Sequence, residues 1–319
     1  MAKAIAKPAI SAEQKQKNKK QLRIQIKRHW MLYLFLLPCI VWLLVFCYAP
    51  MAGIVLAFKN YRFDLGIFGS EWAGLKHFRK FVTSPEFWMT IKNTLVITSL
   101  KLVVCFPAPI ILALLLNEVK AERFKKTVQT ISYLPHFIST VSIVGILFMV
   151  LSPNGGIVNI IIQKLGGTPI YFMTESKWFR TIYVASGVWQ NLGWDAIIYI
   201  AALAGVNQEL YEAAVIDGAS RLKQIWHVSL PGIRSTIVVM LIMRMGGMMS
   251  SNTDKVLLMQ NALTYEVSDI MGTYVYRRGI QDADYSYSTA VGLFNSLINV
   301  VFVVTANTIS KRLGESSLW

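Results

Sequence analysis

Hydrophobic positions dominate six stretches of the chain, and polar positions gather between them. Each stretch approaches or exceeds the roughly 20 residues that a tilted helix needs to cross a bilayer. The sequence therefore predicts an all-α membrane protein with six transmembrane helices, at residues 30–58, 88–117, 128–151, 181–206, 234–258 and 286–310. The second helix is expected to bend where Pro107 and Pro109 interrupt it.

The segment between the fourth and fifth stretches mixes polar and apolar residues and carries its own helix signals. Asn207 is a good N-cap, and Gly218 permits a bend that other residues resist. A second amphipathic pattern follows Gly218, and Pro231 is expected to end it before the next hydrophobic run. Residues 207–233 are therefore predicted to form a helix–bend–helix loop at the membrane surface, with small residues beside the carboxylate of Glu212.

Composition supports the membrane assignment and gives an orientation. Of the 319 residues, 54% are hydrophobic and only 15% are charged, against about 25% charged in soluble domains. Nine Lys or Arg residues lie within residues 1–28, directly before the first hydrophobic stretch. Such a basic tail marks the cytoplasmic side and attracts anionic lipid headgroups. We expect a cytoplasmic tail at 1–28, a membrane domain at 29–319, and N- and C-termini that are both cytoplasmic.

Several other classes of protein are excluded. The net charge of +15 does not indicate nucleic-acid binding, because the basic tail accompanies no binding motif. The chain has no GxxxxGK[ST] phosphate loop, and its three cysteines and four histidines form no metal or catalytic motif. We therefore expect no enzymatic activity and no cofactor in this chain. If transport uses ATP, a partner must bind the ATP and magnesium and carry out the hydrolysis.

Polar groups inside the predicted helices are candidates for a substrate path, because burying them in hydrocarbon is costly. Amides beside indole rings suit sugars, whose C–H faces stack on aromatic rings while their hydroxyls form hydrogen bonds with amides. The alternative is that these groups only hold helices together. The candidates are Trp189, Gln190, Asn191, Trp194, Asn252, Asp254, Asn295 and Asn299.

Cations also fall inside the predicted helices, among them Lys92, Lys101 and Arg244. Arginine keeps its proton at any physiological pH, so Arg244 is expected to have an acidic partner. Asp195, Asp254 and the C-terminal end of a neighbouring helix are the candidates for that partner. Contact with an acidic sugar is the other interpretation of Arg244.

Residues 207–233 contain a spaced motif, in which Glu-Ala-Ala precedes a glycine by three residues and a hydrophobic-x-Leu-Pro sequence follows nine residues later. It is formed by Glu212, Ala213, Ala214, Gly218, Val228, Leu230 and Pro231. This motif resembles the EAA loop of permease subunits of ATP-binding-cassette (ABC) importers, with valine where that family more often has isoleucine. In that family the loop docks into a cleft of the ATPase. The resemblance implies an ATPase-coupling role for Glu212, Ala213, Ala214, Asp217, Gly218, Leu230 and Pro231.

Residues 129–139, 265–269 and 314–319 extend the resemblance over most of 30–319. They resemble permeases for complex oligosaccharides, akin to lipoprotein-linked polysaccharide permeases and the alginate importer permease. The resemblance implies a maltose-permease-like type I importer fold with a cytoplasmic EAA coupling helix, in a bacterial inner membrane. It also implies a second related permease subunit, two copies of an ABC ATPase and an external solute-binding protein, with oligosaccharides, including acidic fragments, as cargo. An importer of another solute and an ATP-independent carrier are the alternatives.

Overall fold

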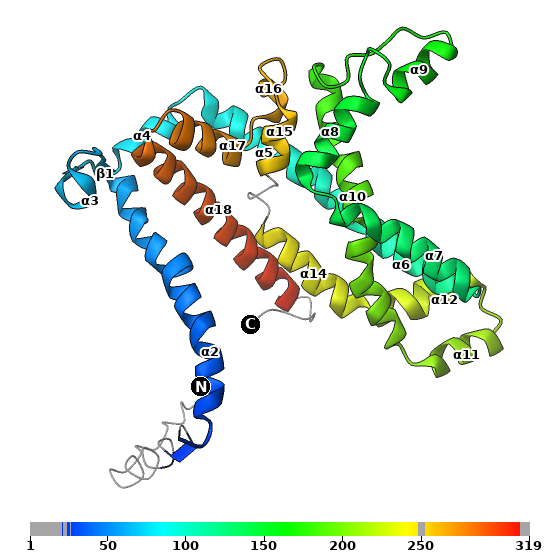
Figure 1. Cartoon of the computed structure of the whole chain (residues 1–319). Helices are drawn as coiled ribbons and strands as arrows, with labels where there is room; N and C mark the ends of the chain where they lie inside the picture. Colours follow the sequence, from blue (N-terminus) through cyan, green and yellow to red (C-terminus); the bar gives the residue numbers. More distant parts are fainter. Residues whose placement is uncertain (1–20, 22–23, 26, 248–252, 313–319) are drawn as a thin grey trace. The chain divides into compact units, whose positions relative to one another are not determined.

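Helices make up almost all of the structure, a computed structural model that describes residues 21, 24–25, 27–247 and 253–312 (Figure 1). The chain divides into two compact units, Met1–Val55 and Leu56–Trp319. The predicted tail at 1–28 lies almost entirely outside the described residues, and so do Asn252 and residues 314–319.

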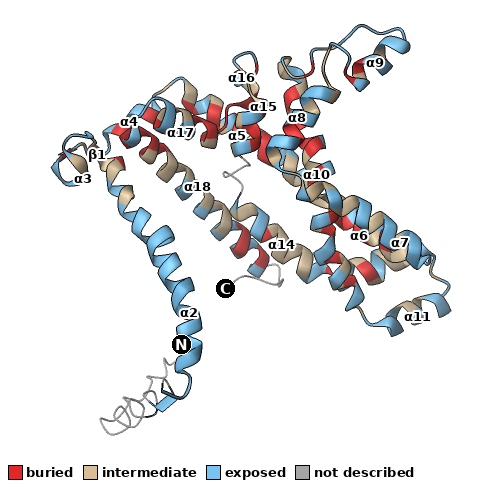
Figure 2. Cartoon of the chain, viewed as in Figure 1, coloured by how far each residue is buried: buried red, intermediate tan, exposed pale blue. Residues whose placement is uncertain are grey.

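The first hydrophobic stretch forms a helical run whose hydrogen-bonding pattern changes along its length. It comprises α2 (Trp30–Leu43), a π-helical turn (Leu44–Tyr48) and a 3-10 helix (Ala49–Phe58). Every residue of α2 is exposed, as Figure 2 shows, and the Phe35 side chain is 78% exposed. An apolar surface of this extent requires lipid or another protein chain to cover it.

The second unit contains the other helices and, within the described residues, one antiparallel pair of strands, β1 (Lys59–Asn60) and β2 (Glu71–Trp72). Its α-helices up to α10 are α3 (Gly66–Gly69), α4 (Lys76–Val82), α5 (Glu86–Cys105), α6 (Pro107–Glu118), α7 (Glu122–Tyr133), α8 (Thr140–Val150), α9 (Ile157–Lys164) and α10 (Ser176–Ala204). The later ones are α11 (Gln208–Ile216), α12 (Arg221–Gln224), α13 (Leu230–Gly232), α14 (Arg234–Gly246), α15 (Thr253–Met259), α16 (Tyr265–Ser268), α17 (Met271–Tyr276) and α18 (Tyr285–Arg312). A 3-10 turn (Leu134–Phe137) and two π-helical turns (Ile225–Ser229 and Arg277–Gln281) complete the unit.

The membrane character predicted from the sequence is confirmed, although the number of crossings is not. Within the described residues, Trp30–Phe58, Glu86–Glu118 and Tyr285–Arg312 are long and apolar enough to cross a membrane. Counting each of two sharply bent helix pairs as one crossing raises the number to five. α10 has 29 residues, but polar residues at its centre, such as Gln190 and Asn191, keep it out of this group. Six crossings therefore stay a prediction.

Two of the predicted helices are interrupted. α5 ends at Cys105 and α6 starts at Pro107, as the two prolines led us to expect. The predicted third helix, 128–151, is not continuous, because the segment that ends at Phe137 meets α8 at an angle of 101°. Ser139 caps α8 by accepting a hydrogen bond from the Ser142 N–H at 3.2 Å. A prediction based on apolar composition was wrong here because a cap and the nearby Pro135 start a new helix.

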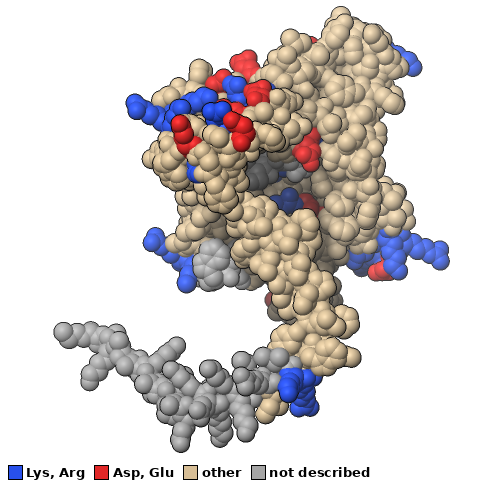
Figure 3. All heavy atoms as spheres, turned by 60° about the vertical axis from the view of Figure 1, so that its left-hand side comes forward, with Lys and Arg blue, Asp and Glu red and all other residues tan. Residues whose placement is uncertain are grey.

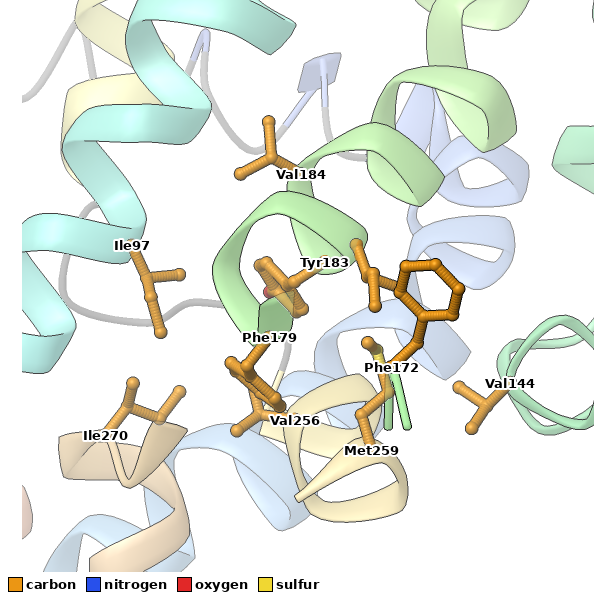
Figure 4. Packing of buried hydrophobic residues seen from close by; sticks show 10 residues of the cluster. Ile97, Val144, Phe172, Phe179, Tyr183, Val184, Val256, Met259 and Ile270 are labelled. Carbon is orange, nitrogen blue, oxygen red and sulfur yellow. The ribbon is translucent and has the colours of Figure 1, made fainter. Parts of the chain in front are cut away.

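The main core surrounds α10, which packs against α5, α6 and α7. Its largest buried cluster brings together side chains from distant parts of the sequence, as Figure 4 shows. Members of that cluster are Ile97 from α5, Val144 from α8, Phe179 and Tyr183 from α10, and Val256 and Met259 from α15. This packing fixes the position of the central part of α10, on which half of the predicted path residues lie.

Buried polar contacts hold the segment 265–287 in place. Asp269 is fully buried and accepts hydrogen bonds from Thr273 at 2.8 Å and from Arg277 at 2.5 Å. The hydroxyls of Tyr274 and Tyr287 lie 2.9 Å apart. The Asp269 carboxylate therefore has the partners that a buried charge requires, which indicates a structural role for it.

α10 approaches α7 so closely that only glycine fits at position 193. A Cβ atom at Gly193 would lie 2.3 Å from the backbone oxygen of Ser132. We expect Gly193→Ala to destabilise the assembled protein by about 1–3 kcal/mol, because the two backbones must move apart. The measurement is the thermal unfolding midpoint of the purified complex in detergent. Gly145→Ala is the control, since a Cβ at that position in α8 meets nothing within 4 Å. Equal midpoints for the two variants would contradict the expectation.

Candidate functional site: the coupling loop and a charged cavity

The first half of the loop at 207–233 is a short helix with well-defined ends. Asn207 caps α11 by accepting a hydrogen bond from the Glu209 N–H at 3.1 Å. At the other end the Gly218 N–H donates to the Val215 oxygen at 3.0 Å, and the Ala219 N–H donates to the Ala214 oxygen at 2.9 Å. These two bonds form a Schellman motif, in which the first residue after the helix C-cap, here Gly218, has a positive φ. Gly218 has a φ of 71°, so the predicted bend is confirmed.

The second half of the loop continues through α12, a π-helical turn and α13. Two side-chain contacts tie it to the first half: Gln224 Nε2 donates to the Ala219 oxygen at 2.9 Å, and the hydroxyls of Tyr211 and Ser229 lie 2.9 Å apart. Pro231 lies one residue before the helical run Arg221–Gly232 ends, close to the end expected from the sequence. A bend of 62° separates this run from α14.

The loop presents an exposed, largely apolar surface. α11 projects from the rest of the unit in Figure 1. Glu212, Ala213, Asp217, Gly218 and Pro231 are exposed, whereas Ala214 and Leu230 are half-buried. Four large apolar side chains of the loop are 62–86% exposed, those of Val215, Ile216, Leu222 and Trp226. Such a patch outside the predicted membrane helices is typical of a contact with another protein.

A groove of about 710 Å³ lies beside this surface. Its walls come from three parts of the chain: the end of α6, the end of α10 and the loop at 207–233. Glu212, Val215, Arg221 and Gln224 line it from the loop. Glu212 has no hydrogen-bond or ion-pair partner among the residues that the structure describes, and its carboxylate is therefore available to a partner chain.

A second cavity, of about 170 Å³, lies between α5, α6, α10, α14 and α15. Figure 3 shows charged side chains inside a hollow on one face of the molecule. The polar residues that line the cavity are Lys101, Tyr183, Asn191, Asp195, Arg244 and Lys255. Arg244 forms an ion pair with Asp195, one of the two partners expected from the sequence. The pair joins α14 to α10.

The predicted path residues do not all meet at this cavity. Asn191 lines it and also contacts His136, whose Nδ1 lies 3.1 Å from Asn191 Oδ1. Trp194 lies instead against the His136 ring, with the ring centroids 4.4 Å apart and the planes at 3°. Gln190 is buried and its Nε2 donates to the Ile138 oxygen at 3.5 Å.

The other predicted path residues lie elsewhere. Trp189 is 46% exposed, Asp254 is exposed at the start of α15, and Asn295 and Asn299 are half-buried in α18. None of these four lines the charged cavity. The cavity also contains Lys101 and Lys255, which lie in the predicted second and fifth helices and were not among the predicted path residues. Their positions as cations inside hydrophobic stretches were the available signal.

Comparison with known proteins finds a transport family and two similar proteins of Bacillus subtilis. Residues 106–315 match the family described as binding-protein-dependent transport system inner membrane component. The chain is 45% identical over 313 residues to the polygalacturonan/rhamnogalacturonan transport system permease protein YteP of Bacillus subtilis (strain 168), covering 98% of both chains. It is also 45% identical to protein LplB of the same strain, over 92% of each chain.

Among solved structures, the chain is similar to one in the crystal structure of a bacterial alginate ABC transporter in complex with alginate pentasaccharide-bound periplasmic protein. The TM-score is 0.87 at 42% identity, covering 93% of this chain and 100% of that chain. The matched family region contains the loop at 207–233 and four of the five helices around the charged cavity, whereas α5 with Lys101 precedes it. The chain therefore belongs to the family of binding-protein-dependent transport system inner membrane components and is an ABC transporter permease subunit.

Proposed function

We propose that the chain is one of two related permease subunits of an ATP-driven importer of acidic oligosaccharides. One relative at 45% identity is named for polygalacturonan and rhamnogalacturonan, and a similar structure belongs to an alginate transporter. All three polysaccharides contain uronic acids. In this proposal the external binding protein delivers the oligosaccharide and the helices alternate access to the two sides of the membrane. The loop at 207–233 transmits movement of the ATPase to α10 and α14, which flank it.

The observation that carries the proposal is the coupling loop itself. Its capped helix, its positive-φ glycine and its exposed apolar face form a rigid projection with a carboxylate at the edge. A protein that only let solutes diffuse through its own helices would have no use for such a projection. We assign ATPase contact to Glu212, Ala213, Ala214, Asp217, Gly218, Leu230 and Pro231.

The partners follow from the same assignment. A second permease or lipid covers the exposed apolar surface of α2, two copies of an ATPase bind ATP and magnesium, and a solute-binding protein docks on the outer side. The family description, which specifies dependence on a binding protein, supports the last of these. The orientation with both termini in the cytoplasm places the loop on the ATPase side, in a bacterial inner membrane.

Replacing Glu212 tests the proposal. We expect Glu212→Ala to lower ATP-driven oligosaccharide uptake about tenfold to a hundredfold, because a hydrogen bond to a charged group is worth about 1.5–3 kcal/mol. Uptake is measured in proteoliposomes that contain the whole complex and the binding protein. Glu209→Ala is the matched control, since Glu209 lies on the same helix but outside the groove and contacts Asn207. Wild-type uptake by Glu212→Ala would reject this coupling contact.

A further inference from the structure

Lys255 is a charged residue of the second unit that is buried without a hydrogen-bond partner among the described residues. It lies on α15, its side chain is only 2% exposed, and Nζ has no hydrogen-bond partner among the described residues. Burying an ammonium group without a counter-charge is costly, so such a group usually has a ligand or a functional role. The contact found for Nζ is the ring of Tyr183, whose centroid is 5.6 Å away. A cation–π contact supplies only part of the stabilising free energy that the ammonium group loses when it is removed from water.

The surroundings of Lys255 add positive charge to the cavity. Lys101, from α5, lines the same cavity, and its Nζ lies 5.9 Å from the centroid of the Tyr183 ring. Asp195 is the one carboxylate among the lining residues, and Arg244 already pairs with it. Three cations and one anion leave a net charge of +2 in this cavity, carried by Lys101 and Lys255.

The neutral polar groups of the cavity suit a sugar. The Tyr183 hydroxyl is buried without a hydrogen-bond partner among the described residues, and Asn191 places an amide in the same lining. Two ammonium groups can bind a carboxylate through charge-assisted hydrogen bonds, while a phenol and an amide can bind neighbouring hydroxyls. A hexuronic acid carries a carboxylate and hydroxyls on one ring. The volume of about 170 Å³ allows one such ring rather than a longer chain.

We propose that this cavity binds the carboxylate of one uronic acid unit of the transported chain, with Lys101 and Lys255 as its ligands. The inference rests on the proposed function and makes it specific, since it assigns the recognition of acidic sugar to two named residues. Neither lysine was a predicted path residue; of those, only Asn191 belongs to this cavity. The Asp195–Arg244 pair lies beside the lysines and keeps the Arg244 charge satisfied when no sugar is bound.

The test measures binding to the purified permease–ATPase complex in nanodiscs by calorimetry, without the solute-binding protein and its own specificity. The probes are trigalacturonate and the neutral trigalactoside obtained by reducing its carboxyl groups. The wild type should bind the acidic probe at least tenfold more tightly than the neutral one. Lys255→Met and Lys101→Met, which keep an unbranched chain but remove the charge, should each weaken binding of trigalacturonate about tenfold to a hundredfold. Lys255→Arg should restore most of the preference.

Lys92→Met is the matched control, because Lys92 lies on α5 like Lys101 but is exposed and outside the cavity. Its affinity for trigalacturonate should equal that of the wild type. Equal affinities of the wild type for the two probes, or unchanged binding in both cavity variants, would overturn the inference. Uptake assays on the same complexes distinguish failure of the proposed function from failure of the proposed lysine site. Lack of ATP-driven uptake by the wild type counts against the proposed function, whatever the binding data show.

Discussion

Replacing Gly218 with valine is expected to reduce ATP-driven uptake at least tenfold while the chain still inserts into the membrane. Gly218 has a φ of 71°, and a left-handed conformation costs an L-residue about 1–2 kcal/mol, with a larger cost for a β-branched side chain. A Cβ atom at this position would meet nothing within 4 Å, so the effect comes from the backbone and not from a clash. A cost of about 1.4 kcal/mol already lowers the population of the native loop geometry tenfold.

The readout is ATPase retained by the permease on purification, together with uptake in proteoliposomes. Ser220→Ala is the comparison, because Ser220 precedes α12 but its side chain forms no capping hydrogen bond. Gly218→Val should lose most of the ATPase, and Ser220→Ala should keep it. Equal retention by the two variants would show that the Schellman geometry is not needed for docking.

Breaking the ion pair between Asp195 and Arg244 should have the second large effect. Removing either partner leaves a single charge in a predicted membrane helix, which costs about 2–3 kcal/mol. The side chain of Asp195 is 20% exposed and that of Arg244 is 40% exposed, which places the cost toward the low end of measured values for buried pairs. We expect both Asp195→Ala and Arg244→Ala to lower the thermal unfolding midpoint of the complex.

The double variant provides the control for this prediction. With both charges removed, neither residue leaves the other without its partner, so the double variant should be more stable than either single variant. The pair joins α10, which ends at Ala204 before the coupling loop, to α14, which begins at Arg234 after it. Strictly additive losses in the double-mutant cycle would mean that the two charges do not stabilise each other.

Local signals in the sequence were sufficient to predict the helix–bend–helix shape of the loop at 207–233. Asn207 and Gly218 act within one helical turn of their own positions, so their roles can be recognised without knowledge of the rest of the fold. The end of the loop was also indicated locally, because the helical run that contains Pro231 ends one residue later, at Gly232. The resemblance of the motif to a known family added the ATPase as partner, which local signals do not contain.

The cavity could not be predicted in the same way, because its residues come from five helices. Arg244 and Asp195 were matched because both carry charge inside predicted helices and oppositely charged groups in hydrocarbon pair. Trp194, one of the predicted path residues, stacks on His136, a residue 58 positions earlier whose proximity no local pattern indicates. Lys255 follows a segment outside the described residues, and only its packing beside Tyr183 showed it to be buried.

The most direct test of the account is transport by the complete complex. Proteoliposomes containing this chain, the second permease and the ATPase would be supplied with the solute-binding protein and labelled trigalacturonate, with and without ATP inside. We predict accumulation of trigalacturonate above its external concentration that requires both ATP and the binding protein. Equilibration of the sugar across the membrane without ATP, or uptake that is indifferent to the binding protein, would contradict an ATP-coupled permease.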